Sequence, residues 1–342
     1  MISSSPPASV PPDQAKLVAA LRQAGLVGAA APVLTPLSGG VSSDIVDVDD
    51  GARRFVVKSA LPKLRVRDDW FADVSRNRVE QAYLRRVGAL LPLAVPRVLF
   101  ADADAGWFAM EYFGAEFANW KVRLLEGSAE IEHARRAGET LGVIHRATWG
   151  NGDVAREFAT WRNFHQLRVE PFLETTAQRV PDLAPQLLAE AARLKRTTLA
   201  LVHGDFSPKN MLVRPGRLVL LDAEVAWFGD PAFDPAFLLT HLHLKALLNS
   251  TASGAMAELT REFWQAYVTG LGAVHANTGL EARTTRLMLC LLLARVHGKS
   301  PVEYLSESRR EFVVAFVRTH LPRPPAQLEA ITAAWLKEIS HQ

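Results

Sequence analysis

Residues 199–224 read LALVHGDFSPKNMLVRPGRLVLLDAE. Two short apolar runs, MLVR and RLVLLD, are joined by Pro215-Gly216, and this pattern predicts a β-hairpin. An apolar strand precedes each of two acids, Asp205 and Asp222, and Asn210 lies between them. The segments on either side have helical periodicity, from IEHARRAGETLGVIHRAT near residue 130 to the apolar runs around 258–270 and 281–297. The hairpin is therefore expected to interrupt a mainly helical region.

The N-terminal part of the chain has a different pattern. VSSDIVDVDD and ARRFVVKSAL, joined at Asp50-Gly51, predict a second hairpin with Lys58 on its returning strand. Residues 73–87 have apolar positions on one helical face and place Glu80 near the middle of that helix. Two more strands are expected within residues 95–114, separated by a turn at 104–106.

These patterns predict an α+β fold with two lobes. A chain of 342 residues exceeds the usual size of one compact core. Residues 1–14 are Ser/Pro-rich and are expected to be a disordered lead-in, because such a composition buries little apolar surface. Residues 15–114 are expected to form a small antiparallel β lobe, and residues 115–342 a larger helical lobe that contains the quoted stretch. SPVE at 300–303 has the pattern of a helix N-terminus.

Composition narrows the choice of partners and location. The formal net charge is +3 and no long Lys/Arg run is present, so nucleic acid is not expected as a partner. The single cysteine, Cys290, lies in an apolar run and is expected to be a buried structural residue. No segment approaches the ~18 apolar residues of a membrane span, and the N-terminus lacks a signal-peptide pattern. The expectation is a cytoplasmic protein without membrane association.

The spacing of His203-Gly204-Asp205, Asn210 and Asp222 points to phosphoryl transfer. That reaction needs a carboxylate near the attacking hydroxyl and hard oxygen ligands for Mg²⁺ on the ATP phosphates. The motif H-G-D-x-x-x-x-N, followed one hairpin later by an aspartate, resembles that of the aminoglycoside phosphotransferase and choline kinase superfamily. The alternative for any one of these residues alone is a polar turn or a helix cap.

The resemblance implies a protein-kinase-like fold with ATP and Mg²⁺ in the cleft between the lobes. It also implies that Asp205 is the catalytic base, that Asn210 and Asp222 are metal ligands, and that His203 braces the loop. The fold, the cofactors and the family of the chain are thus expectations taken from these motifs.

A kinase of this kind also needs a strand lysine over the phosphates and a helix glutamate that holds it. Lys58 and Glu80 occupy the corresponding places; the alternative is that both are ordinary surface residues. Within SGGVSS at 38–43, a phosphate-covering loop is expected, because glycines allow backbone N–H groups to approach phosphate. The residues assigned to nucleotide binding are Lys58, Ser38, Gly39, Gly40 and Ser42 in this loop and strand, and Glu111, Tyr112 and Phe113 at the expected hinge between the lobes.

Two segments resemble methylthioribose kinases in particular. VVKSALPKLRVRDDWFADVSRNRVE is similar to the region that follows the strand lysine in those enzymes, and DAEVAWFGDPAFD is similar to their D-x-E metal motif. This second resemblance adds Glu224 to Asn210 and Asp222 as a metal ligand. Asp234 in the same segment either braces the loop at Asp205 or caps a helix before Pro235.

The sequence therefore predicts a kinase that phosphorylates a hydroxyl of a small molecule. Few acids lie in the C-terminal helices, which disfavours a polycationic acceptor, but the acceptor itself stays open. The alternatives are a nucleotide-binding pseudokinase that serves as an interaction module and, less favoured, a protein kinase. The protein-kinase alternative is weakened because no long activation segment follows Asp222. The choice between monomer and homodimer also stays open.

Overall fold

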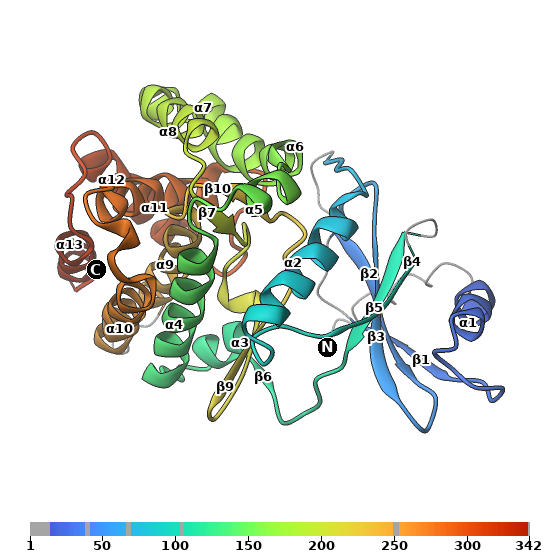
Figure 1. Ribbon diagram of the computed structural model, residues 1–342. Coiled ribbons are helices and arrows are strands. Elements are labelled where there is room, and N and C mark those ends of the chain that lie inside the picture. Colours follow the sequence, from blue (N-terminus) through green and yellow to red (C-terminus); the bar gives the residue numbers. More distant parts are fainter. Residues whose placement is uncertain (1–13, 38–41, 66–69, 103–105, 249–252, 341–342) are drawn as a thin grey trace.

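The computed structural model describes residues 14–37, 42–65, 70–102, 106–248 and 253–340 (Figure 1). The smaller lobe is built on one antiparallel sheet of order β1-β2-β3-β5-β4. Its strands are β1 (Val33–Pro36), β2 (Ser43–Asp49), β3 (Arg54–Ala60), β4 (Val98–Asp102) and β5 (Trp107–Glu111). Helix α1 (Gln14–Gln23) precedes the sheet, and helix α2 (Arg76–Leu90) lies between it and the larger lobe (Figure 1).

The larger lobe is mainly helical and carries short strands near its junction with the sheet (Figure 1). The predicted hairpin is present as β8 and β9, which pair in antiparallel register with Arg214 opposite Arg217. The remaining strands are β6 (Ala118–Asn119), β7 (Ala200–Val202), β8 (Met211–Arg214), β9 (Arg217–Leu220) and β10 (Trp227–Gly229). Strand β6 extends the hairpin through β8, and β10 pairs with β7.

The helices of this lobe form two runs, one before β7 and one after β10. They are α3 (Trp120–Leu125), α4 (Ile131–Thr148), α5 (Gly152–Glu157), α6 (Trp161–Phe164), α7 (Thr175–Arg179), α8 (Ala184–Arg196), α9 (Phe233–Ala246), α10 (Ser253–Leu271), α11 (Leu280–His297), α12 (Glu307–His320) and α13 (Leu328–Ile339). Short 3-10 turns lie at Pro181–Leu183 (η2), Pro208–Asn210 (η3) and Gly272–His275 (η5). A π-helix, η1, spans His165–Glu174. Among the described residues no helix combines the length and apolar character needed to cross a membrane.

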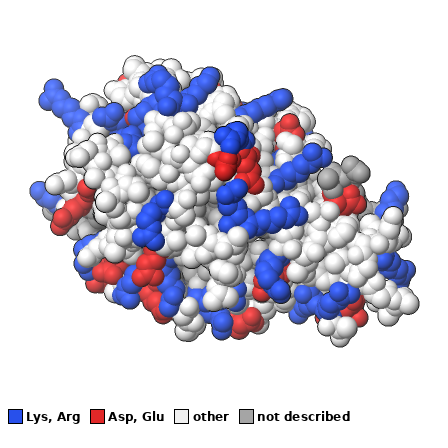
Figure 2. Space-filling model, viewed as in Figure 1, with Lys and Arg blue, Asp and Glu red and all other residues white. Residues whose placement is uncertain are grey.

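The predicted α+β class with a small antiparallel sheet and a larger helical part is confirmed, and so are the two hairpins. The first hairpin turns at Asp50, whose carboxylate accepts hydrogen bonds from the backbone N–H groups of Ala52 and Arg53, and at Gly51, whose φ is +85°. Figure 2 shows basic side chains distributed over this face of both lobes, with acidic ones among them.

Other expectations need correction. Gln14 is the first residue of α1 and not part of a lead-in, and residues 1–13 lie outside the described residues. The helix expected at 73–87 begins at Arg76, because the Asp73 carboxylate accepts a hydrogen bond from the Ser75 N–H and forms a turn before it. The SPVE segment does not begin a helix; α12 begins at Glu307, capped by Ser306. Strand β1 is an addition to the expected elements.

Helices α4 and α10 cross in backbone contact through glycines. A Cβ built on Gly142 would lie 2.5 Å from the carbonyl oxygen of Tyr267, and one on Gly138 would lie 2.3 Å from that of Phe263. Only glycine allows an approach this close. The crossing brings His145 of α4 to Tyr267 of α10, where the ring nitrogen Nδ1 and the hydroxyl oxygen are 2.9 Å apart.

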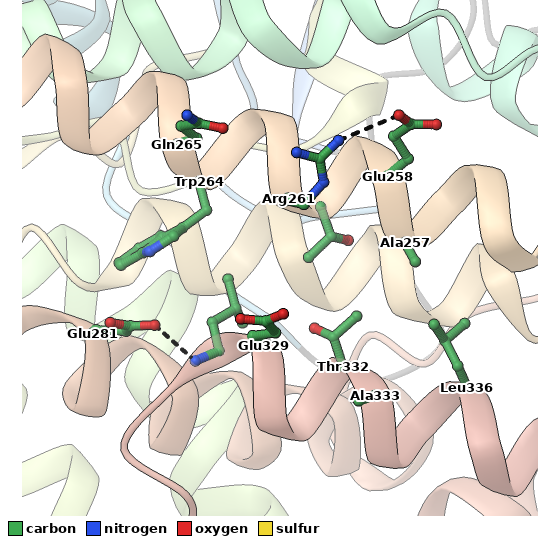
Figure 3. A pocket seen from close by; sticks show the side chains of 12 residues that line it. Ala257, Glu258, Arg261, Trp264, Gln265, Glu281, Glu329, Thr332, Ala333 and Leu336 are labelled. Carbon is green, nitrogen blue, oxygen red and sulfur yellow. Dashed lines mark hydrogen bonds and ion pairs between the residues drawn. The ribbon is translucent and has the colours of Figure 1, made fainter.

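A groove on the outer side of the lobe separates α10 from α13 (Figure 3). Its volume is about 470 Å³, and its lining includes Arg261, Trp264, Thr332 and Leu336. The Glu281 carboxylate closes one end by accepting a hydrogen bond from the Leu328 N–H. None of the residues that the sequence assigns to a site lines this groove.

The glycine crossing yields a stability prediction. Gly142→Ala is expected to lower the free energy of unfolding by about 1–3 kcal/mol, because the added methyl meets backbone atoms that cannot move independently. Gly254→Ala, in the first turn of α10 with nothing within 4 Å of the added carbon, is the matched control. It is expected to be neutral or to stabilise by up to about 1 kcal/mol. Equal urea midpoints for the two variants would contradict the crossing.

Candidate active site

Lys58 of β3 lies at the centre of a buried cluster of acids. Its Nζ is 2.7 Å from Oε2 of Glu80 on α2 and 2.5 Å from Oδ1 of Asp222, which follows β9. Lys58 is 3% exposed and Glu80 1% exposed. The alternation of β3 turns Lys58 inward, and the apolar face of α2 carries Glu80 to meet it. The surface alternative for this pair is therefore excluded.

The charges in this cluster compensate one another. Burial lowers the pKa of Lys58, but Asp222 and Glu80 raise it by more, so the pKa lies above its usual range and the ammonium stays protonated. Burial raises the pKa of Glu80 more than Lys58 lowers it, and Asp222 and Glu224 add to the increase. Acids crowded in this way gain from an added cation.

Three carboxylates of this cluster form a set of hard oxygen donors. One oxygen each from Glu80, Asp222 and Glu224 lies within 4.8 Å of the others. Asp222 has φ +65°, a left-handed backbone rarely adopted by a residue other than glycine, which aims its carboxylate toward Lys58. The donor set and its excess negative charge fit a divalent cation such as Mg²⁺.

Glu224 also joins the two lobes. Its Oε2 is 3.1 Å from Nε of Arg76, the first residue of α2. The Arg76 guanidinium is fully buried and donates further hydrogen bonds to the backbone carbonyls of Ser42, Leu61, Ala72 and Asp73. This arginine therefore fixes the ends of β2 and β3 against the segment that follows Asp222.

The loop at 203–210 is held by a buried carboxylate on α9. Asp234 accepts hydrogen bonds from the backbone N–H groups of His203, at 2.7 Å, and Gly204, at 2.9 Å. Gly204 has φ +79°, and a Cβ there would lie 2.7 Å from the carbonyl oxygen of Val225, so this position requires glycine. Of the two interpretations of Asp234, these contacts favour the brace, and no side-chain cap is formed at the start of α9.

His203 links the loop to the strand that leads to Asp222. Its Nε2 is 3.1 Å from the carbonyl oxygen of Leu221, and its Nδ1 accepts a hydrogen bond from the Asp205 N–H at 3.2 Å. These two contacts require the tautomer protonated on Nε2. Burial lowers the pKa of His203, which keeps the ring neutral in that tautomer. Tyr83 of α2 packs edge-on against it.

Asp205 lies between two cations that its sequence motif did not reveal. Its Oδ2 is 3.0 Å from Nη2 of Arg168 and 2.9 Å from Nζ of Lys209. Burial raises the pKa of Asp205, but Arg168 and Lys209 lower it by more, so the pKa lies well below its usual range. The Asn210 side-chain amide donates to the Asp205 carbonyl oxygen at 3.0 Å and closes the loop.

The structure places the remaining predicted residues in different ways. Ser42 is buried at the start of β2, where its carbonyl accepts from Arg76. Glu111 ends β5 and its N–H is already bonded to the Arg97 carbonyl. Tyr112 and Phe113 follow in the connection from β5 to β6, half-buried. Ser38, Gly39 and Gly40 lie outside the described residues.

Sequence reasoning missed Arg168, Lys209 and Arg76. Lys209 stands four residues after Asp205, and that spacing in a short turn could have suggested the contact. Arg168 gave no signal, because it lies on the π-helix η1 and reaches Asp205 only through the tertiary fold. π-Helical turns are frequent at functional sites, but they are not predicted by the sequence patterns used above.

The sequence of this chain is similar to those of known phosphotransferases. A family model described as "Phosphotransferase enzyme family" matches residues 33–280. A methylthioribose kinase from Yersinia pseudotuberculosis is 27% identical over 220 residues, which cover 57% of this chain and 54% of that protein. The chain thus spans about half the length of the curated relatives it matches.

Solved structures show the same fold at low sequence identity. A Plasmodium vivax ethanolamine kinase has a TM-score of 0.54 at 12% identity, covering 93% of this chain and 85% of its own. An amicoumacin kinase has a TM-score of 0.52 at 15% identity, covering 93% and 96%. The expected kinase-like fold, and the resemblance to these phosphotransferases and to methylthioribose kinases, are confirmed. Because the family model spans more than half of its residues, the chain belongs to the phosphotransferase enzyme family.

Proposed function

We propose that this chain is an ATP- and Mg²⁺-dependent kinase that transfers the γ-phosphoryl group to a hydroxyl of a small molecule. The observation that carries the proposal is that Asp234 braces the loop of Asp205, and that His203 joins this loop to the residue before Asp222, whose carboxylate meets Lys58. The family and the kinase names of the relatives support it.

In this proposal Lys58 contacts the α- and β-phosphates of ATP, and Glu80 keeps it in place. Asp222, Asn210 and Glu224 would hold Mg²⁺; the close set of carboxylate oxygens supports this role for Asp222 and Glu224. Bound Mg²⁺ neutralises charge on the phosphate oxygens. The amicoumacin kinase was solved in complex with AMP-PNP and Ca²⁺, which is consistent with a nucleotide and a divalent cation in this fold.

Ser38, Gly39, Gly40 and Ser42 are proposed to cover the phosphates, and the backbone of Tyr112 and Phe113 to meet the adenine. The N–H of Glu111 is occupied by Arg97, which leaves its carbonyl for that contact. His203 is proposed to act only as a brace.

The transfer step uses Asp205 as base. The acceptor hydroxyl oxygen attacks the γ-phosphorus, while the bond to the β,γ-bridging oxygen breaks and ADP leaves with that electron pair. The hydroxyl proton passes to the Asp205 carboxylate. A base of low pKa accepts a proton only late in the reaction, which suits a loose transition state with little early proton transfer. Arg168 fixes the carboxylate, and Lys209 adds positive charge beside it.

The first test is Asp205→Asn, which keeps the shape and removes the base. Turnover is expected to fall at least about 100-fold, while the affinity for Mg·AMP-PNP stays nearly unchanged. The measurement is ADP release with a panel of aminoglycosides, methylthioribose, choline, homoserine and simple sugars, with slow ATP hydrolysis as the signal if no acceptor is used. Asp182→Asn, an exposed acid paired with Arg318, is the control. Full activity of Asp205→Asn would remove it as the base.

The second test concerns the cation. Asp222→Asn is expected to weaken Mg²⁺-dependent binding of AMP-PNP by about tenfold or more, because a charged hard ligand is replaced by a neutral one. Calorimetric titration with Mg²⁺ and with EDTA measures the metal-dependent part. Asparagine also tolerates the left-handed backbone at this position, so the fold is kept. Equal metal dependence in the two proteins would speak against Asp222 as a ligand.

The third test concerns pH. Because Arg168 and Lys209 hold the pKa of Asp205 low, the base stays ionised, and kcat/KM should show no acid limb from it between about pH 5 and 8. Lys209→Met removes one of the cations, so the pKa of Asp205 rises and the acid limb moves to higher pH. Lys337→Met, an exposed lysine on α13, should leave the profile as in wild type. An unchanged profile for Lys209→Met would show that Lys209 does not tune the base.

A further inference from the structure

A second group of basic and aromatic side chains lies in the helical lobe, next to Arg168. Arg168 and Arg295 of α11 both pack against the ring of Phe172, with guanidinium carbons 5.7 and 5.8 Å from its centroid. Lys245 of α9 lies with its Nζ 5.5 Å from the ring centroid of Tyr304. The group, called here the basic cluster, consists of Arg295, Lys245 and Tyr304, and Arg168 connects it to Asp205.

The members of the basic cluster have hydrogen-bond donors that the described part of the chain does not satisfy. Lys245 Nζ, Arg295 Nε and Tyr304 Oη are buried atoms without a hydrogen-bond partner there. Lys245 is 3% exposed, so water does not compensate its charge easily. Arg295 uses Nη1 to contact Ser300 Oγ at 3.2 Å, which leaves Nε free. Buried donors without partners are costly, and a bound ligand that supplies the missing acceptors removes that cost.

The charged groups of this region influence one another. Burial, with a smaller effect from Lys121 and Arg295 and against the opposing effect of Glu303, lowers the pKa of Lys245 to about 7. Burial also lowers the pKa of Arg295, and Tyr304 and Asp205 oppose that change. Arg295 and Lys245 thus lie near each other, and Asp205 is among the acids that favour the charged form of Arg295.

The acids around the basic cluster are already engaged. Glu303 pairs with Lys121 at 2.7 Å and is largely exposed, and Glu170 pairs with Lys299 at 2.7 Å. Asp205 itself is held by Arg168 and Lys209. His241, which is buried nearby on α9, has its pKa lowered by burial and by Lys245 and stays neutral. The donors of the basic cluster therefore lack an acceptor, which an anionic group would supply.

We propose that the acceptor carries an anionic group, a carboxylate or a phosphate, which Arg295, Lys245 and Tyr304 bind while its hydroxyl meets Asp205. The inference rests on the proposed kinase function and specifies its substrate class as hydroxylated acids. Arg295 and Tyr304 are half-buried, so part of each side chain is open to solvent. A polycation placed here would meet like charges, so polycationic acceptors are disfavoured.

The test uses four acceptors built on three carbons: glycerate, glycerol phosphate, neutral glycerol and cationic serinol. Binding to the full chain is measured by calorimetry in the presence of saturating Mg·AMP-PNP. The nucleotide then fills the proposed ATP site, so that the test anions cannot bind there. Glycerate or glycerol phosphate is expected to bind at least about tenfold more tightly than glycerol and serinol. Preference between the two anions tells a carboxylate from a phosphate ligand. Equal binding of glycerol and both anions would overturn the proposal.

Variants of the basic cluster supply the matched comparison. Lys245→Met and Arg295→Met are expected to weaken anion binding at least about tenfold, Arg295→Lys to retain part of it, and Lys337→Met to leave it unchanged. Lys245→Met should also raise the melting temperature of the ligand-free protein, because a buried unpaired charge is replaced by an apolar chain of similar length. Anion binding unaffected by either methionine variant would place the anion elsewhere and refute the assignment.

The outcomes separate this inference from the proposed function. If Mg·AMP-PNP fails to bind, the kinase proposal fails, and the anion titrations repeated without nucleotide still decide whether the basic cluster binds anions. If Asp205-dependent transfer occurs to glycerol or serinol with no preference for the anions, the kinase proposal stands and the substrate class is wrong. Transfer to an anionic acceptor with a raised KM in Arg295→Met supports both.

Discussion

The buried carboxylate of Asp234 is the constraint on which the reacting side of this molecule depends. It has no exposed surface and accepts hydrogen bonds from two consecutive backbone N–H groups, those of His203 and Gly204. Behind it, His145 Nε2 lies 3.4 Å away, and Tyr267 holds the other ring nitrogen of that histidine. The glycine crossing of α4 and α10 sets the spacing between Tyr267, His145 and Asp234. The packing of the helical core therefore determines the position of the loop that carries Asp205.

The opposite side of the site is organised by charge. Lys58 would be costly to bury alone, and the same holds for Glu80; each is stable because the other and Asp222 are present. The three residues come from β3, α2 and the turn after β9, so the ion pairs hold together elements remote in sequence. Asp205, in contrast, is held by cations on its own lobe. Asp222 and Asp205 therefore have distinct surroundings, which is consistent with the separate roles proposed for them, metal binding for Asp222 and contact with the acceptor for Asp205.

Much of the fold could be predicted because the signals are local. The turns at Asp50-Gly51 and Pro215-Gly216, the alternation of the strands and the HGD…N…D spacing each report on a few neighbouring residues, and the hairpins follow from them. The contacts of Arg76, Arg168 and Lys245 could not be predicted, since each depends on how separate helices pack. The SPVE error has a similar cause: a capping pattern was present, but Ser300 contacts Arg295 across the loop. Local sequence patterns thus located the motif. The side chains that contact it from other elements could be identified only in the tertiary structure.

The two ion pairs between the lobes bear on how easily the lobes separate. Lys58–Asp222 and Arg76–Glu224 span the junction from the sheet and α2 to the segment after β9. Parting the lobes to admit or release a nucleotide requires both pairs to break or to be replaced, so they form a latch. On the proposed function, nucleotide phosphates would compete with Asp222 for Lys58, and the divalent cation would compete with Lys58 and Arg76 for the carboxylates. On the proposed kinase function, separation of the lobes is then expected to influence how fast a nucleotide enters and leaves the site.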